Sequence, residues 1–147
     1  MNVRIRSLDS RDIEAVLAIQ AGCPEIAQWA MWDYDRVAHG EMAGWVAEED
    51  AQVKGFLVAR RVLNEMEILN FAVMQSARRR GVGASLLREA LAWSQTFVAE
   101  KAILEVRESN AAALRFYERH NFQVSGRRKT YYTAPIEDAL LLTASLR

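Results

Sequence analysis

The chain has 147 residues, of which 51% are hydrophobic and 26% are charged, and its 19 basic residues balance its 19 acidic ones. This length and composition suit one globular domain, and we expect residues 1–147 to form it. Zero net charge argues against nucleic acid or a membrane surface as a partner, and a single cysteine excludes an internal disulfide. No apolar run is long enough to span a bilayer, so we expect a cytoplasmic protein.

The first third of the chain predicts a strand followed by two helices. Residues 2–8 alternate apolar and polar side chains, which is typical of a strand with one solvated face. Asp9 can cap a helix that keeps helical spacing as far as Gln20 and ends near Gly22. Residues 24–44 predict a loop and a second short helix, rich in aromatic residues. These aromatics either attach the helix to the core or line a substrate pocket, and the sequence leaves both interpretations open.

The rest of the chain predicts a sheet that changes from antiparallel to parallel pairing. An amphipathic helix is expected after Gly83, and a second one is expected to be capped by Ser109 and Asn110. These helices separate strands of the same predicted sheet along the sequence, so the expected fold class is α/β (α+β). Further strands are expected over residues 45–49, 52–63, 65–73, 102–107, 122–132 and 138–146.

The turn between the strand at 65–73 and the following helix has the composition of an anion site. Three arginines, 78–80, precede Gly81 and Gly83. A helix N-terminus leaves about four backbone N–H groups without partners, and glycine allows an anion to approach them closely. A solvated basic turn at a helix start is the alternative. The glycines alone do not decide between the two.

Two side chains are candidates for proton transfer. Glu105 lies within an apolar run, where a carboxylate without a partner is costly to bury and can serve as a general base. Alternatively, its side chain leaves the sheet and pairs with Arg107 or another cation. Tyr117 lies on an apolar helical stripe, either as a core residue with a locally satisfied hydroxyl or as a proton donor to a leaving group. Cys23 and the two histidines have no partners at catalytic or metal-ligand spacing.

With these residues the chain resembles the GCN5-related N-acetyltransferase (GNAT) superfamily. Arg78-x-x-Gly81-x-Gly83 matches the pyrophosphate motif of that superfamily, and residues 70–73 resemble its fourth strand. Residues 110–122 resemble its Asn-x-x-Ala…Tyr-Glu…Gly-Phe segment. The resemblance implies a mixed, centrally splayed sheet of about seven strands flanked by about four helices.

Residues 104–113 and 128–139 further resemble the bacterial ribosomal-protein-alanine N-acetyltransferases. This resemblance implies Glu105 as proton acceptor and Tyr117 as proton donor. Since no residues have metal-ligand spacing, we expect no metal. The resemblance also implies an N-terminal alanine of a ribosomal protein as acceptor, with Trp29, Tyr131 and Tyr132 in the acceptor site. The implied acetyl-CoA contacts are Phe71, Ala72, Val73, Arg78, Arg79, Arg80, Gly81, Val82, Gly83, Ala84 and Asn110. A small-molecule amine or a lysine as acceptor, and a CoA-binding module without catalysis, are the alternatives.

Overall fold

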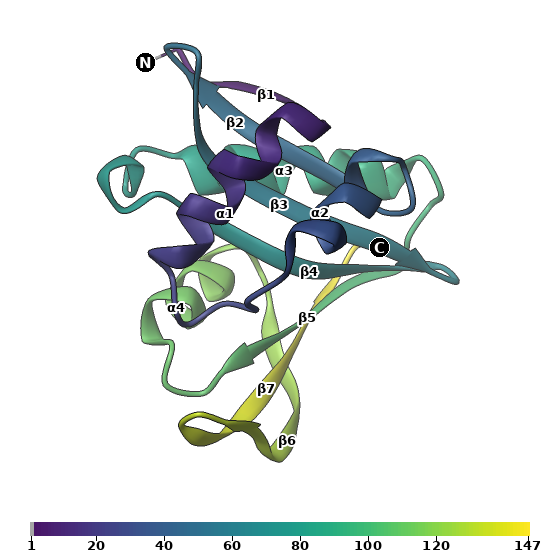
Figure 1. Ribbon diagram of the computed structural model, residues 1–147. Helices are drawn as coiled ribbons and strands as arrows, with labels where there is room; N and C mark the ends of the chain where they lie inside the picture. Colours follow the sequence, from purple (N-terminus) through teal and green to yellow (C-terminus); the bar gives the residue numbers. More distant parts are fainter. Residues whose placement is uncertain (1) are drawn as a thin grey trace.

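The computed structural model describes residues 2–147, which form a seven-stranded sheet with helices on both faces (Figure 1). The helices are α1 (Ile13–Ala21), α2 (Met31–Ala38), α3 (Val82–Gln95) and α4 (Ala111–Arg119), with short 3₁₀ turns η1 (Ser10–Asp12) and η2 (Gln75–Ala77). The strands are β1 (Arg4–Ser7), β2 (Ala43–Glu49), β3 (Gln52–Val62), β4 (Glu65–Val73), β5 (Lys101–Arg107), β6 (Gln123–Thr133) and β7 (Ile136–Ser145).

The sheet is mixed and opens at its centre. Its strand order is β1-β2-β3-β4-β5-β7-β6, and every neighbouring pair is antiparallel except β4 with β5. Those two parallel strands pair with each other only at 65–67 and 101–103. Beyond these residues they continue to Val73 and Arg107 without pairing with each other. The predicted splayed mixed sheet is therefore confirmed, and the unpaired ends of β4 and β5 face a gap between them.

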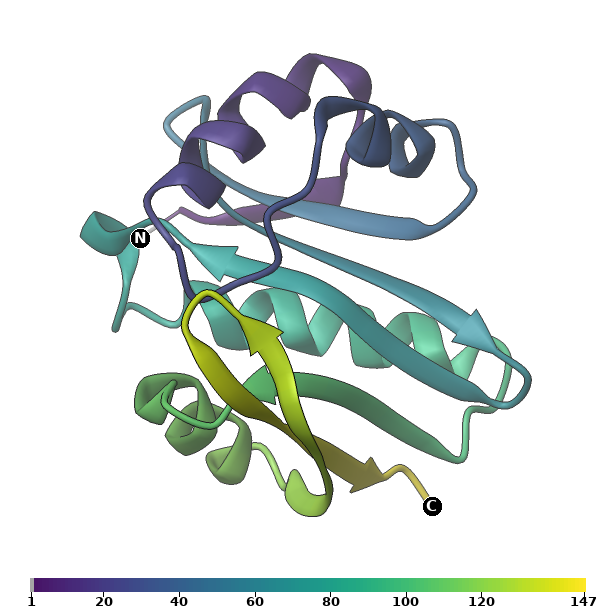
Figure 2. The same cartoon turned by 60° about the horizontal axis from the view of Figure 1, so that its bottom comes forward.

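Two apolar cores lie on opposite faces of the sheet. One contains Leu86 and Leu87 of α3 and Tyr117 of α4, packed on β5 and β7. The other contains Val16 of α1 and Tyr34 of α2, packed on β2 and β3. Figure 2 shows α3 and α4 on the side of the sheet away from α1 and α2. Each face of the sheet can therefore bring a different set of side chains to the gap.

A bulge in β4 exchanges these two faces within one strand. Val58 pairs with Asn70 while the next residue, Ala59, pairs with Ile68, so Leu69 is the extra residue. Before the bulge, Ile68 packs in the core under α3. After it, alternation is shifted by one, and Phe71 packs towards the α3 side while Asn70 is buried towards α1 and α2.

The N-terminal cap is confirmed, although it caps a 3₁₀ turn rather than α1 itself. Asp9 and Asp12 form a reciprocal capping box around η1. Arg6 donates to the Asp12 carboxylate at 2.8 Å and to Glu48 at 2.8 Å, so β1, η1 and β2 are joined through one guanidinium. Although burial alone would raise it, these hydrogen bonds hold the pKa of Asp12 below its usual value.

One helix boundary differs from the prediction. The amphipathic pattern placed residues as far as Val98 on the buried face of the helix after Gly83, but α3 begins at Val82 and ends at Gln95. Val98 instead adopts a positive φ of 52° and is exposed. Within residues 2–147 no helix is long and apolar enough to cross a membrane.

Candidate active site

The turn before α3 presents backbone N–H groups that no side chain caps. Gly81 is the N-cap residue and has a left-handed backbone, with φ 82°. Arg79 also has a positive φ of 64°, which is unusual for a residue other than glycine and is typical of functional turns. The first turn of a 14-residue helix thus has free donors and the positive end of the helix dipole. This geometry fits the phosphate groups that the sequence motif predicts.

The three arginines of this turn point in different directions. Arg80 pairs with Glu49 of β2 at 2.7 Å. Arg78 donates from Nε to the carbonyl of Val73 at 3.0 Å and from Nη2 to the sulfur of Cys23 at 3.2 Å. Arg79 has no ion pair or side-chain hydrogen bond to any other residue in 2–147, and it is exposed. Arg79 is therefore the arginine of the three whose charge is available at the mouth of the turn.

The end of β4 has one edge without a neighbouring strand. Met74 donates its backbone N–H to Lys54 of β3, whereas the carbonyl of the preceding Val73 accepts from Arg78 instead of from a strand. Since successive residues of a strand direct their backbone groups to opposite edges, Phe71 and Val73 present theirs to the gap. Ala72 is buried between them on the other face. An extended ligand could therefore pair with this edge as another strand would.

Tyr117 is buried, and its hydroxyl makes no hydrogen bond to another residue of 2–147. Its ring meets those of Phe71, Phe116 and Phe122 edge-on, with centroids 6.2, 5.4 and 5.4 Å away. No completely enclosed side-chain polar atom of residues 2–147 lacks a hydrogen-bond partner, so the unbonded Tyr117 hydroxyl keeps slight contact with its surroundings outside the core. Burial raises the pKa of Tyr117 well above its usual range. The hydroxyl is therefore protonated and free to donate.

Asn110 is committed to the helix that carries Tyr117. Its side-chain oxygen accepts from the backbone N–H of Ala113 at 3.2 Å and caps α4, as predicted. Asn121, which follows the helix at the position of the glycine in the family motif, has a left-handed backbone with φ 70°. Asn110 thus orients α4, and its amide nitrogen is free for a ligand.

Glu105 is half-buried and paired with a cation, which is one of the two alternatives that the sequence left open. On β5 its neighbours Leu104 and Val106 point into the core that contains Tyr117, so alternation directs Glu105 to the opposite face. There its Oε1 lies 2.9 Å from Nε of Arg128 on β6. The pairing alternative is therefore the one observed, with Arg128 in place of Arg107.

Aromatic and charged side chains of the β6–β7 hairpin surround this pair. The Arg107 guanidinium lies over the ring of Tyr132, 4.0 Å from its centroid, and pairs with Glu137 at 3.0 Å. Tyr131 is 51% exposed and its ring packs edge-on against Tyr132, with centroids 5.1 Å apart. The hairpin thus brings both predicted acceptor-site tyrosines to the face of the sheet that carries Glu105.

The loop that contains Trp29 is held by a buried network of polar side chains. Gln20 donates to the Trp29 carbonyl at 2.8 Å and accepts from the Trp29 N–H at 3.1 Å. Tyr34 donates to Gln20, and Asn70 donates to the Tyr34 oxygen at 2.9 Å and to the carbonyl of Ala27 at 3.1 Å. The network ties the loop to β4 directly beside the bulge, which fixes its position over the gap.

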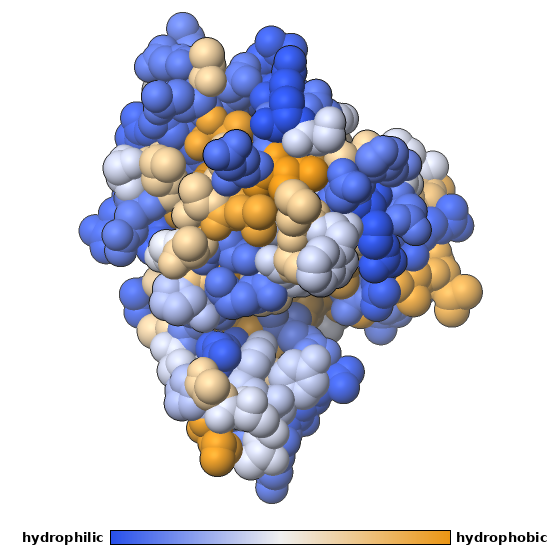
Figure 3. Space-filling model, viewed as in Figure 1, coloured by the Kyte–Doolittle hydropathy of each residue, from blue (hydrophilic) through white to orange (hydrophobic). Residues whose placement is uncertain are grey.

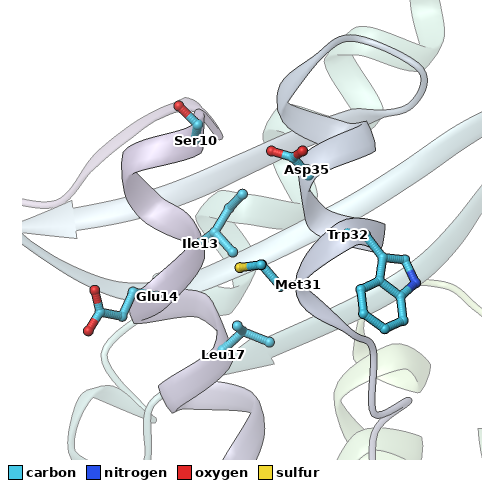
Figure 4. A pocket seen from close by; sticks show the side chains of 7 residues that line it. All are labelled: Ser10, Ile13, Glu14, Leu17, Met31, Trp32 and Asp35. Carbon is cyan, nitrogen blue, oxygen red and sulfur yellow. The ribbon is translucent and has the colours of Figure 1, made fainter.

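The aromatics of residues 29–34 differ in their surroundings. Tyr34 is fully buried and Trp29 packs on it, with centroids 5.2 Å apart. Trp32 is 69% exposed and lines a groove of about 460 Å³ between α1 and α2, where apolar residues gather on the surface (Figure 3). Figure 4 shows its lining: Ser10, Ile13, Glu14, Leu17, Met31, Trp32 and Asp35. None of the predicted site residues lines this groove.

Sequence reasoning did not identify Gln20, Asn70 as a loop anchor, or Arg128 as the partner of Glu105. A polar residue on the buried face of a predicted helix was the available signal for Gln20, and an amide within an apolar strand was the signal for Asn70. Arg128 begins the segment 128–139 that resembles the ribosomal-protein-alanine N-acetyltransferases, but nothing in the sequence indicated that it pairs with Glu105.

Comparisons with known proteins agree with this geometry. Residues 9–122 match the acetyltransferase (GNAT) family. The chain is 31% identical to an N-alpha-acetyltransferase of Sulfolobus acidocaldarius, over 99% of this chain and 94% of that protein. The ribosomal-protein-S18-alanine N-acetyltransferase of Escherichia coli has a similar crystal structure, with 26% identity, a TM-score of 0.86 and coverage of 99% and 94%. Ard1 of Thermoplasma volcanium gives 27% identity and a TM-score of 0.90, with coverage of 100% and 99%.

Proposed function

The chain belongs to the acetyltransferase (GNAT) family, whose members use acetyl-CoA, and we propose that it acetylates the N-terminal α-amino group of a protein, specifically an N-terminal alanine of a ribosomal protein. The similarity to an N-alpha-acetyltransferase and to a ribosomal-protein-alanine N-acetyltransferase supports this class of acceptor. The observation that carries the proposal is the position of Glu105 and Tyr117, on opposite faces of the sheet beside the gap between β4 and β5.

Acetyl-CoA supplies the thioester, and the turn before α3 has the groups to hold its pyrophosphate. The free N–H groups of Val82, Gly83 and Ala84 and the charge of Arg79 are the proposed contacts. The open edge of β4 at Phe71 and Val73 would pair with the amide groups of the pantetheine arm. Arg78, which occupies the Val73 carbonyl in the free protein, would have to release it.

The reaction proposed is direct attack of the acceptor nitrogen on the acetyl carbonyl carbon. The C–N bond forms, the C–S bond breaks, and no covalent enzyme intermediate is needed. An α-amino group has a pKa of about 8, so a substantial fraction is neutral near pH 7. Glu105 accepts the proton that the nitrogen loses, directly or through a water, and Tyr117 donates a proton to the departing sulfur. Exchange with solvent then restores both groups.

The developing negative charge on the acetyl oxygen needs a fixed donor. The backbone N–H of Val73 faces the gap on the same edge as its carbonyl and is the proposed donor. The acceptor residue would lie between the Trp29 loop and Tyr131 and Tyr132. One flanking segment is a loop and the other is the last part of the edge strand β6, so a flexible chain terminus can enter between them.

Intact-mass analysis of peptides incubated with acetyl-CoA tests the proposal. We expect one acetyl group on a peptide that begins with alanine and none on the same peptide with a blocked N-terminus, even if it contains lysine. Glu105→Gln should lower kcat about 10²- to 10⁴-fold. Glu108→Gln, three residues further on and exposed, is the matched control and should retain activity. Acetylation of the blocked peptide would contradict the proposed acceptor.

A further inference from the structure

One side chain of the acceptor region is bound to the proposed base by a contact that the proposed reaction does not use. Nε of Arg128 lies 2.9 Å from Oε1 of Glu105, and neither residue has another ion pair within the described chain, 2–147. The free protein therefore holds a cation against the carboxylate to which the acceptor nitrogen must come.

Arg128 reaches Glu105 by crossing an intervening strand. β7 lies between β5 and β6, and Ala139 on β7 pairs with both Arg107 of β5 and Arg128 of β6. Directly paired residues direct their side chains to the same face, and so does Glu105, two residues from Arg107 on β5. Because Ala139 has only a methyl group, the Arg128 side chain can pass over β7 towards Glu105. A larger residue at that position would obstruct this path.

The contact has the properties of one that is readily exchanged. The Arg128 side chain is 55% exposed and that of Glu105 is 22% exposed, and ion pairs near the surface contribute little to folding stability. The strand bulges directly after Arg128, where the register shifts between Arg128 and Tyr132. The ring of Tyr131 lies 5.5 Å from the guanidinium carbon and offers it a second resting surface. The guanidinium can therefore leave Glu105 without losing every partner.

We propose that Arg128 occupies the place of the acceptor's ammonium group on Glu105 and thereby determines specificity for cationic amine termini. The inference rests on the proposed function, in which Glu105 receives the acceptor nitrogen. A protonated amine is a compact cation that displaces the guanidinium from the carboxylate. The bound ammonium loses one proton to solvent before the attack and a second proton to Glu105 as the C–N bond forms. Once Glu105 has released that proton to solvent, the nitrogen is an uncharged amide, Arg128 returns to the carboxylate and the product loses its contact.

Steady-state kinetics with an alanine N-terminal peptide test the displacement. Arg128→Gln should lower the acceptor KM roughly 1.5- to fivefold, the strength of an exposed ion pair, because nothing then competes for Glu105. Inhibition by the N-acetylated peptide should be unchanged, since an amide has no charge with which to compete. Arg128→Lys should restore a KM near that of the wild type. Arg127→Gln, which loses pairs to Glu108 and Asp138 instead, should leave KM unchanged.

A second measurement does not depend on turnover. The NMR signal of the Arg128 Nε–H should move when alaninamide is added and should stay in place with N-acetylalaninamide. It should also stay in place with alaninamide in the Glu105→Gln variant.

The two measurements separate the possible failures. An unmoved Nε–H signal, or an acceptor KM that Arg128→Gln leaves unchanged or raises, overturns the role of Arg128 even if the wild type acetylates the peptide. A parallel fall in KM and in the inhibition constant of the acetylated peptide also overturns it, because Arg128 would then be only a steric obstacle. A moving signal in a protein that acetylates no N-terminal peptide supports the ammonium site and contradicts the proposed acceptor instead.

Discussion

The proposed donor and acceptor sides of the gap are built from different kinds of groups. The donor side, the end of β4 and the turn before α3, offers backbone N–H and C=O groups, a left-handed glycine and the unpaired Arg79. The acceptor side, the Trp29 loop and the β6–β7 hairpin, offers side chains that are already paired with one another. On the donor side a ligand therefore meets mostly unpaired groups and has to displace Arg78 from the Val73 carbonyl, whereas an acceptor meets side chains that are already paired.

This difference predicts which property each side controls. Backbone groups bind the phosphate and amide groups of a constant cosubstrate, and substitutions of side chains change them little. Paired side chains can be replaced singly, so a change of acceptor is possible without a change of donor. Variants on the two sides should accordingly affect separate kinetic constants, and the predictions below test this separation in order of expected effect.

The largest effect is expected where the two sides meet, at Tyr117. Tyr117→Phe should lower kcat about 10²- to 10⁴-fold, because the departing sulfur loses its proton donor. Thermal unfolding should be unchanged, since the hydroxyl has no hydrogen-bond partner within residues 2–147 and the ring remains. A normal kcat of this variant would mean that another group protonates the departing sulfur. A lower Tm would mean that the hydroxyl stabilises the fold.

A substitution of Gln20 should disturb the acceptor side and leave the donor side intact. Gln20→Ala removes partners from the N–H and C=O of Trp29 and from the Tyr34 hydroxyl, and unsatisfied buried groups cost about 1–3 kcal/mol each. We expect a lower free energy of unfolding in denaturant titrations and a higher acceptor KM, with the KM for acetyl-CoA unchanged. An equal rise of both constants would show that the two sides are not separable.

Gly81 provides the reciprocal experiment on the donor side. A Cβ at Gly81 meets no atom within 4 Å, so Gly81→Ala costs only the left-handed backbone strain, about 1–2 kcal/mol, and misplaces the N–H groups of α3. The KM for acetyl-CoA should rise while the acceptor KM stays constant. Gly40→Ala is the matched control, because Gly40 has φ 88° and equal space but lies between α2 and β2. It should lose similar stability and keep both constants.

The smallest effect is expected from pH, and it concerns Asp12, which helps to join β1, η1 and β2. The folded pKa of Asp12 lies below its usual value of about 4, so its contribution to stability is complete above that value and is lost as pH falls through the lower folded pKa. Asp12→Asn should be less stable than the wild type at pH 7. In acid titrations below about pH 4, the free energy of unfolding of the wild type should fall more than that of Asp12→Asn, so the two values converge. Parallel acid titrations of both proteins would contradict this role.

The donor side was more predictable from sequence than the acceptor side, for the same structural reason. Gly81 and the helix start after it are local features, and Asp9 and Asn110 act on neighbouring backbone, so their positions follow from spacing. The partner of Glu105 lies 23 positions away on a strand that is not its neighbour, so it depends on the sheet order. The direction of Arg78, towards Val73 and Cys23, likewise depends on contacts far apart in sequence.

The bulge at Leu69 has a consequence for how this strand tolerates change. The bulge shifts the alternation of side chains by one residue. In β4, even-numbered residues before the bulge face the core under α3, and odd-numbered residues after it face that core. Deleting Leu69 would act as a frameshift in the folded protein: Phe71 would turn away from Tyr117, and Asn70 would turn away from the loop it anchors. A substitution of Leu69 leaves the alternation on both sides of the bulge unchanged, whereas an insertion or deletion in β4 does not.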